Sequence, residues 1–323
     1  RRGFQGTRAP PSGPVSDETL FDHYTDGKPT ADAIRRFVED TEKHDLRYVL
    51  LVGNAKSNGI QSPLPTGYLP SGWVNASIGR APSDQWFVQH PSARKVAIGR
   101  LPVTSTEEAR LLVRKTLDYA TQSNGPWQRR IVWYQDREAP YELQERRIAE
   151  MSERGFESIV LSPATPNLRS ATVDWLDRGA LLTHFKGHGF RTYLRVGAAG
   201  AAEDAYVLQA EDLARESTSP HQTIFVALSC YTAEFTHPTS TSVAEQLLLR
   251  PKGGAVAVLA PTWANWPGFT LTRGFFEGLT PGATVGQASR NARDFVNRPA
   301  LRLQYVLLGD PALPIPIARP EAN

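Results

Sequence analysis

The chain has only one cysteine, Cys230, and only one methionine among its 323 residues. A single cysteine excludes an internal disulfide and any Cys-x-x-Cys site, and it leaves the redox compartment undetermined. No apolar run reaches the ~20 residues that a bilayer-spanning helix needs, so we expect no membrane span. No signal peptide is visible, and the chain starts at Arg1-Arg2 rather than Met, which suggests a processed chain or an excised fragment.

Several functional signatures are also absent. The net charge is only +3, and no Lys/Arg run interleaved with aromatic residues occurs, so we expect no nucleic-acid partner. The sequence contains no G-x-S-x-G, P-loop, G-x-G-x-x-G or H-E-x-x-H motif. His184 and His188 have metal-ligand spacing, but no third ligand cluster accompanies them. We therefore expect no zinc site and no required cofactor.

Short apolar runs alternate with amphipathic segments along most of the chain. The run at 46–53 predicts a strand buried on both faces of a parallel sheet, and 29–44 predicts an amphipathic helix. After a strand at 95–103, Ser105 and Glu108 predict a capping box at the start of a helix. Further strands are expected at 130–136, 157–162, 180–187, 223–229 and 254–260, with helices at 141–155 and 242–251. This alternation predicts an α/β fold with a largely parallel sheet flanked by helices.

The domain organisation is suggested by composition. Residues 1–16 are rich in Pro, Gly, Ser and Arg and are expected to form a loose N-terminal arm. The segment "SNGPWQ" at 123–128 is the best candidate boundary between two halves. We therefore expect two tightly packed subdomains, at 17–126 and 127–323.

Cys230 and His188 each follow an expected strand, and function gathers at the carboxyl ends of strands in such sheets. A nucleophilic cysteine needs a neighbouring base or cation and donors that stabilise an oxyanion. The glycines on either side of His188 permit close backbone approach and unusual dihedral angles, and the Gly189 N–H could bind an oxyanion. The alternative is that a lone cysteine at a strand end is a buried, inert side chain.

The segments "FKGHGF" and "ALSCYTAEF" resemble those of the gingipain family of cysteine peptidases, which have a caspase-like fold. The resemblance covers roughly residues 20–317 and includes "YVLLVGN", "PSDQWFVQ", "KVAIGRLPVTSTEEARLLVRKTLDYA", "SVAEQLL" and "LLGDPALPIP". It implies that Cys230 is the nucleophile and His188 the catalytic histidine. It further implies that the main-chain N–H groups of Gly189 and Cys230 hold the oxyanion.

The same resemblance implies a substrate pocket. Asp84, in the segment "SDQ", would bind the side chain of Arg or Lys through charge-assisted hydrogen bonds. Trp263 or Trp266 would lie over that side chain, and Ser229 is a further substrate-binding candidate. Alternatively, Asp84 is a turn or helix-cap residue and the tryptophans belong to the core. The resemblance thus implies an endopeptidase that cleaves proteins or peptides after Arg or Lys, secreted or at the cell surface.

Two departures from the family pattern are visible: the residue after "LLVG", and the long stretches that flank the catalytic pair, such as 190–222, which share little with the gingipains. Asn54 stands where relatives often have an acidic residue after "LLVG", so the acid that orients His188 is not identified. Asp84, Asp136 and Glu138 are candidates. Family members often bind calcium, but no D-x-D-x-D-type loop occurs, so a structural calcium ion is left open and no metal ligands are assigned.

A sorting-type transpeptidase and a catalytically silent caspase-like binding module are the alternative functions.

Overall fold

The computed structural model of the chain describes residues 13–57, 68–122, 125–136, 141–197, 206–265 and 269–317. Within these residues an eight-stranded sheet lies at the centre of the molecule. Its strands are β1 (Tyr48–Val52), β4 (Ala97–Leu101), β5 (Arg130–Tyr134), β6 (Glu157–Leu161), β7 (Leu182–Lys186), β11 (Thr223–Leu228), β12 (Ala255–Pro261) and β13 (Tyr305–Leu308). They are ordered β1-β4-β13-β12-β11-β7-β5-β6, and every pairing is parallel except that of β12 with β13.

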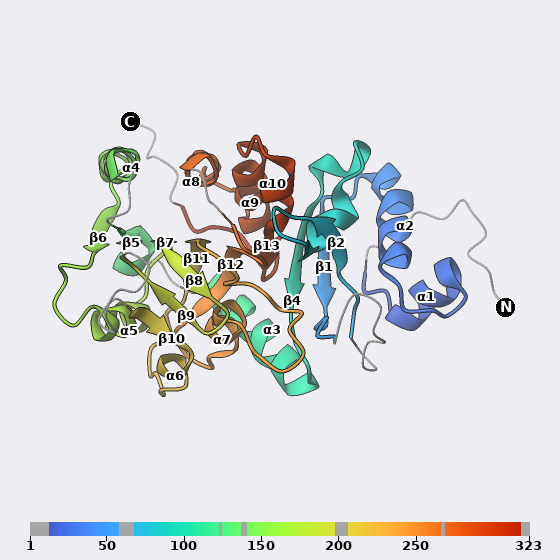
Figure 1. Cartoon of the computed structure of the whole chain (residues 1–323), viewed down its shortest axis with the longest axis horizontal. Helices are drawn as coiled ribbons and strands as arrows, with labels where there is room; N and C mark the ends of the chain where they lie inside the picture. Colours follow the sequence, from blue (N-terminus) through green and yellow to red (C-terminus); the bar gives the residue numbers. More distant parts are fainter. Residues whose placement is uncertain are drawn as a thin grey trace.

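Helices cover both faces of this sheet (Figure 1). They are α1 (Asp17–Thr25), α2 (Ala31–Thr41), α3 (Thr106–Thr121), α4 (Tyr141–Glu153), α5 (Leu168–Arg178), α6 (Ala210–Leu213), α7 (Val243–Leu249), α8 (Phe269–Glu277), α9 (Val285–Asp294) and α10 (Pro299–Gln304). Short 3₁₀ helices are η1 (Glu42–His44), η2 (Asp84–Val88), η3 (Ser92–Lys95) and η4 (Pro126–Arg129). The expected α/β architecture with a largely parallel sheet is confirmed.

Two smaller sheets were not predicted from the sequence. One is the hairpin β2 (Gly72–Asn75) and β3 (Arg80–Ser83), and the other contains β8 (His188–Phe190), β9 (Tyr193–Arg195) and β10 (Tyr206–Gln209). Strands of three or four residues are too short to show a clear alternation of apolar and polar side chains. The second of these sheets begins at His188 and so takes part in the candidate site.

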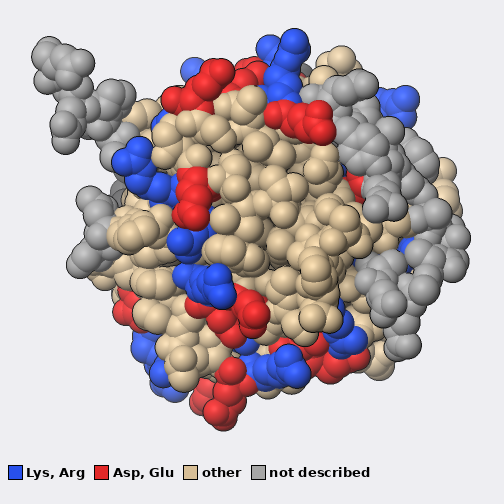
Figure 2. Space-filling view, turned by 90° about the vertical axis from the view of Figure 1, so that its left-hand side faces the viewer, with Lys and Arg blue, Asp and Glu red and all other residues tan. Residues whose placement is uncertain are grey.

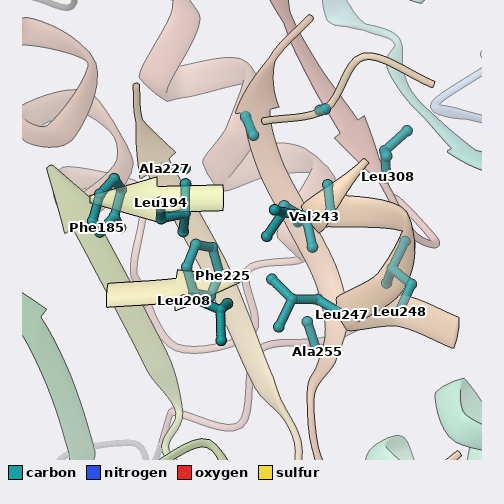
Figure 3. Close-up of a cluster of buried hydrophobic side chains, with 14 of the residues drawn as sticks. Phe185, Leu194, Leu208, Phe225, Ala227, Val243, Leu247, Leu248, Ala255 and Leu308 are labelled. Atoms are coloured by element: carbon teal, nitrogen blue, oxygen red, sulfur yellow. The ribbon is translucent and has the colours of Figure 1, made fainter. Parts of the chain in front are cut away.

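Alternate side chains of each central strand point to opposite faces of the sheet. In β5, Ile131 and Trp133 join a core cluster with α4, α8 and α9, whereas Val132 and Tyr134 join one with α3, α5 and α7. Figure 3 shows the second cluster, in which α7 and the small sheet pack against the central strands. Its labelled residues are Phe185, Leu194, Leu208, Phe225, Ala227, Val243, Leu247, Leu248, Ala255 and Leu308.

One local expectation was wrong, and a second was confirmed only in part. Strand β1 is not buried on both faces, because it is an edge strand, and Leu50 and Val52 are 39% and 47% exposed. The capping box of α3 is only half formed. The Glu108 N–H does donate to the Ser105 hydroxyl (3.1 Å), but the Glu108 carboxylate accepts from the Thr104 N–H (2.7 Å) instead of that of Ser105.

At the opposite edge of the sheet, β6 also has a neighbour on one side only. Val160 of β6 is 43% exposed, and Leu143 of α4 is 47% exposed. Figure 2 views the molecule from this side. Most of the charged side chains that are visible there surround a broad area without Lys, Arg, Asp or Glu. None of the described helices combines the length and the apolar character needed to cross a membrane.

Gly254, in the turn before β12, and Gly79 have similar positive φ angles but differ in how tightly their surroundings are packed. Gly254 has φ +64° and Gly79 has φ +68°. A Cβ atom at Gly254 would lie 2.4 Å from the Leu247 carbonyl oxygen, whereas a Cβ atom at Gly79 would meet nothing within 4 Å. We expect Gly79→Ala to lower the free energy of unfolding by ~1 kcal/mol, the cost of the backbone conformation. Gly254→Ala should cost at least ~2 kcal/mol more because of the clash. If urea denaturation showed the same decrease in the free energy of unfolding for both variants, it would contradict this packing.

Candidate active site

Two neighbouring parallel strands lead directly to His188 and Cys230. Strands β7 and β11 are paired in a register that ends with Lys186 opposite Leu228. The Gly187 N–H donates to the Leu228 carbonyl oxygen (3.1 Å), which continues the pairing beyond the strand. After Gly187 the chain enters β8, and Gly189 lies against Ser229 and the Cys230 carbonyl oxygen, so His188 and Cys230 both lie at the carboxyl edge of the sheet. The fold thus brings together the two residues that the sequence singled out.

The glycines beside His188 allow the two chain segments to approach closely. A Cβ atom at Gly189 would lie 2.8 Å from the Cys230 carbonyl oxygen and 2.9 Å from the Ser229 Cβ, so this position admits no side chain. Neither Gly187 nor Gly189 has a positive φ, so the expectation of unusual dihedral angles was wrong. The site requires Gly187 and Gly189 because glycine has no side chain, and not because of its backbone freedom.

The N–H of Gly189 is oriented by the hairpin that follows it. Strands β8 and β9 pair Phe190 with Tyr193 and Gly189 with Leu194. In a hairpin with a two-residue loop the closing pair is hydrogen-bonded, and the next pair is not. We therefore expect the Gly189 N–H to point away from β9, so that it does not take part in the ladder.

The thiol of Cys230 lies against the segment that follows β12. It is half-buried, and its Sγ donates to the main-chain carbonyl oxygen of Asn265 (3.2 Å). The Asn265 N–H in turn points to Sγ (3.4 Å) and would stabilise a thiolate. The side-chain amide of Asn265 is buried without a hydrogen-bond partner among the described residues. Nothing in the sequence alone identified Asn265.

The residues next to the thiol include a strained position and an aromatic cluster. Tyr231 has φ +53°, which is rare for a residue other than glycine, and its N–H donates to the Trp263 carbonyl oxygen (3.2 Å). Its ring lies 5.3 Å from that of Trp263 and 5.5 Å from that of Phe190, between ring centres. The indole N–H of Trp263 donates to the Ile78 carbonyl oxygen in the turn between β2 and β3 (2.6 Å). Trp263 therefore lies near the thiol, whereas Trp266 is outside the described residues.

Ser229, the substrate-binding candidate before the cysteine, is almost fully buried. Its hydroxyl forms a hydrogen bond with the hydroxyl of Thr232. The Thr232 hydroxyl also donates to the Cys230 carbonyl oxygen (3.2 Å). These contacts fix the turn that carries the thiol.

Asp84 is paired with a buried arginine on β4. Its two carboxylate oxygens accept from the Arg100 guanidinium at 2.7 and 2.9 Å, and one also accepts from the Ser71 hydroxyl (3.0 Å). Arg100 is fully buried and also donates to the carbonyl oxygens of Gly53 (2.7 Å) and Leu69 (3.1 Å). Asp84 is the first residue of η2, and the N-cap position belongs to Ser83. Its evident partner is therefore Arg100, which the sequence analysis did not consider.

A second buried carboxylate, Glu234, lies four residues after the cysteine. It is 6% exposed, and its Oε2 lies 3.2 Å from the Arg191 Nε in the loop between β8 and β9. Burial raises the pKa of Glu234 to about 7, while Arg191 opposes this increase and nearby Glu245 adds to it. Glu234 therefore changes its charge close to neutral pH.

The acid that would orient His188 is still unassigned. Asp136, at the end of β5, is buried and accepts from the Gly197 N–H (2.9 Å), and Glu138 lies outside the described residues. Asn54 donates to the Pro102 carbonyl oxygen (3.0 Å) and to Glu245 (3.1 Å), so it holds that buried carboxylate in place.

His184, one of the two histidines with metal-ligand spacing, lies in the core beneath the site. It is fully buried, its Nε2 bonds to the Thr272 hydroxyl (3.0 Å), and burial lowers its pKa to about 3. Its ring also packs against that of Trp133, with 5.3 Å between ring centres. Among the residues that the structure describes, no group of three His, Cys, Asp or Glu could hold a metal ion.

Comparison with known proteins identifies the class to which this fold and site belong. The model of peptidase family C25 matches residues 14–316. This match covers nearly the whole chain, and the chain belongs to peptidase family C25. Among curated protein sequences, none matches it at a significant level.

Solved structures of peptidases have a similar fold. The Arg-specific cysteine proteinase gingipain R (RgpB) matches with a TM-score of 0.72 and 18% identity, over 92% of this chain and 70% of that chain. The complex of Porphyromonas gingivalis RgpB pro- and mature domains matches with a TM-score of 0.71 and 20% identity, over 88% of this chain and 70% of that chain. A structure described as a protease has a TM-score of 0.67 and 15% identity, covering 90% and 72%. The family and the gingipain fold, which is caspase-like, support a cysteine peptidase.

The pairing of Asp84 with Arg100 can be tested through stability. Asp84→Asn would leave the charge of Arg100 buried without a counterion, so we expect the free energy of unfolding to fall by ~3–5 kcal/mol in chemical denaturation. Replacing both residues, in Asp84→Asn/Arg100→Met, should restore part of this loss. Glu39→Gln, which breaks the more exposed pair of Arg35 and Glu39 (2.9 Å), is the control and should cost less than ~1 kcal/mol. An Asp84→Asn variant as stable as the wild type would contradict the structural role.

Glu234 should make stability depend on pH. Its ordinary pKa is 4.5, and in the folded protein it is about 7, so the folded state holds an extra proton between these values. The free energy of unfolding should therefore fall as the pH rises from 4.5 to 7 and level off above 7. Glu234→Gln removes this contribution, whereas Glu153→Gln, at an exposed position on α4, should keep the wild-type profile. Urea denaturation at pH 5 and 7.5 measures the difference, and identical profiles for wild type and Glu234→Gln would refute it.

Proposed function

We propose that the protein is a cysteine endopeptidase in which Cys230 is the nucleophile and His188 the acid–base residue. The observation that supports the proposal is the parallel pairing of β7 with β11, which ends two residues before His188 and two before Cys230, so that both follow neighbouring strands at the carboxyl edge of the sheet. Membership of peptidase family C25 supports the same reaction.

In the proposed reaction the Cys230 thiolate attacks the carbonyl carbon of the scissile peptide bond. The negative charge that develops on the carbonyl oxygen is held by the main-chain N–H groups of Gly189 and Cys230. His188 donates a proton to the leaving amine, which leaves an acyl group on the sulfur. His188 then accepts a proton from water as the water attacks the acyl group, and the carboxylic acid and the thiolate are released.

The proposal extends to cleavage after Arg or Lys. It rests on the likeness to an Arg-specific proteinase and on the position of Trp263 beside the thiol, where its ring can pack against a substrate side chain. Asp84 contributes less directly than the resemblance implied, because Arg100 already neutralises its charge. The carboxylate is 2% exposed and already accepts two hydrogen bonds from Arg100 and one from Ser71, so the proposal does not rest on a direct contact between Asp84 and the substrate.

Matched fluorogenic peptides ending in Arg, Lys, Asp or Asn test both parts of the proposal. We expect turnover of the Arg or Lys peptides, and a loss of at least ~10³-fold in kcat/KM in Cys230→Ala and in His188→Ala. The control is Ser152→Ala, at an exposed residue of α4, which contributes none of the residues described at the thiol, and this variant should keep wild-type activity. Turnover only after Asp or Asn would contradict the specificity but keep the mechanism.

Equal turnover in the wild type and Cys230→Ala would refute the mechanism itself. Lack of turnover in the wild type, together with a Cys230 thiol that reacts with a peptidyl electrophile no faster than free cysteine does, would refute it as well. Transfer of the acyl group from Cys230 to an added amine instead of to water would indicate a transpeptidase with the same nucleophile.

A further inference from the structure

A second polar site lies between the first part of the chain and the helices near its end. A cavity of about 360 Å³ is bounded by α2, η2 and the residues after η2 on one side and by α9 and α10 on the other. Four arginines line it, Arg35, Arg290, Arg293 and Arg302. Asp294 is the one acidic residue among the described residues of its wall. Neither Cys230 nor His188 lines this cavity, so it is separate from the proposed catalytic site.

Arg293 is the least satisfied charge in this wall. The residue is only 5% exposed, and its Nη1 is closed to solvent and has no hydrogen-bond partner among the residues that the structure describes. Among the described residues, no carboxylate lies within ion-pair distance of its guanidinium. Burial lowers the pKa of Arg293 to about 10; Asp294 partly opposes this, and Arg290 and Arg302 add to it. Since a buried charge without a counterion is costly, the arrangement favours an anion in the cavity.

A second buried donor in the same wall is also unused. Gln85 of η2 is 4% exposed, and its Nε2 has no hydrogen-bond partner in the described part of the chain. Arg35 is already paired with Glu39 (2.9 Å), and Arg290 donates to the Lys95 carbonyl oxygen but forms no ion pair within the described parts of the chain.

The charge of the cavity suggests the class of ligand. Leaving out the paired Arg35, the wall holds the positive charges of Arg290, Arg293 and Arg302 against the single negative charge of Asp294. The excess is therefore two positive charges. A phosphate group carries close to two negative charges at neutral pH, and guanidinium groups bind its oxygens through paired hydrogen bonds.

We propose that this cavity binds a phosphate group, either as the free ion or as a phosphate monoester. The cavity is about 360 Å³, roughly twelve times the ~30 Å³ that one water molecule occupies in the liquid, so it has room for an organic substituent beside the phosphate. The bound group would connect η2 near the start of the chain to α9 and α10 near its end. Because it would bind only the folded protein, it would raise the stability of the whole chain.

Thermal unfolding in the presence of phosphate tests this proposal. With 10 mM inorganic phosphate or glycerol phosphate at pH 7, and ionic strength matched with sodium chloride, we expect the wild-type Tm to rise by about 2 °C. A larger rise with the ester would identify a monoester as the preferred form, and equal rises would identify recognition of the phosphate group alone. No rise with either compound would overturn the proposal.

Substitutions locate the binding. In Arg293→Met the rise with phosphate should disappear, while the Tm without phosphate should be at least that of the wild type because an unpaired buried charge has been removed. Arg302→Gln, at a less buried position, should weaken phosphate binding at least fivefold in calorimetric titration and gives a test if Arg293→Met does not fold. Arg114→Gln, an exposed arginine of α3 outside the cavity, should keep the full response. An unchanged response in both Arg293→Met and Arg302→Gln would overturn the proposal.

Discussion

The pairing of β7 with β11 is the constraint on which the candidate site depends. A parallel pair keeps a constant offset between its strands, so two residues that follow the strands by equal distances lie at the same edge of the sheet. A slip of one residue would turn every side chain of a strand to the other face of the sheet. Phe185 and Phe225 oppose such a slip, because both pack into the core cluster that α7 covers (Figure 3). The apolar core thus fixes the register of the two strands that lead to His188 and Cys230.

A second constraint comes from the buried guanidinium of Arg100. A charge removed from water needs a counterion and further hydrogen bonds, and Arg100 obtains them from Asp84 and from main-chain carbonyl groups of three other residues. These partners belong to the end of β1, the segment before β2 and the start of η2. The Arg100 side chain therefore connects these three segments of the first part of the chain. Its guanidinium also lies over the ring of Phe235, 5.0 Å from the ring centre, in the segment that follows Cys230.

Much of the fold was readable in the sequence because the inner strands are continuous apolar runs. Strands β11 and β12 are buried at every position, and a run of that kind is typical of a strand covered on both faces. Residues 46–53 show the same pattern, yet β1 lies at the edge of the sheet. An apolar run carries no information about how many neighbours its strand has, so this difference could not be predicted. The β8–β10 sheet escaped prediction because its strands are so short.

Within the candidate site, the sequence by itself determined the nucleophile and histidine candidates, because each directly follows a recognisable strand. Only the tertiary structure decided what surrounds them. Tyr231, Asn265 and Trp263 meet at the thiol through contacts between the loops after β11 and β12. The sequence also could not show that Asp84 faces Arg100, or that the Arg293 Nη1 is buried with no hydrogen-bond partner among the described residues. The reason is physical: strand formation and burial follow from the local pattern of apolar side chains, whereas the partner of a charge is set by which distant segments the fold brings into contact.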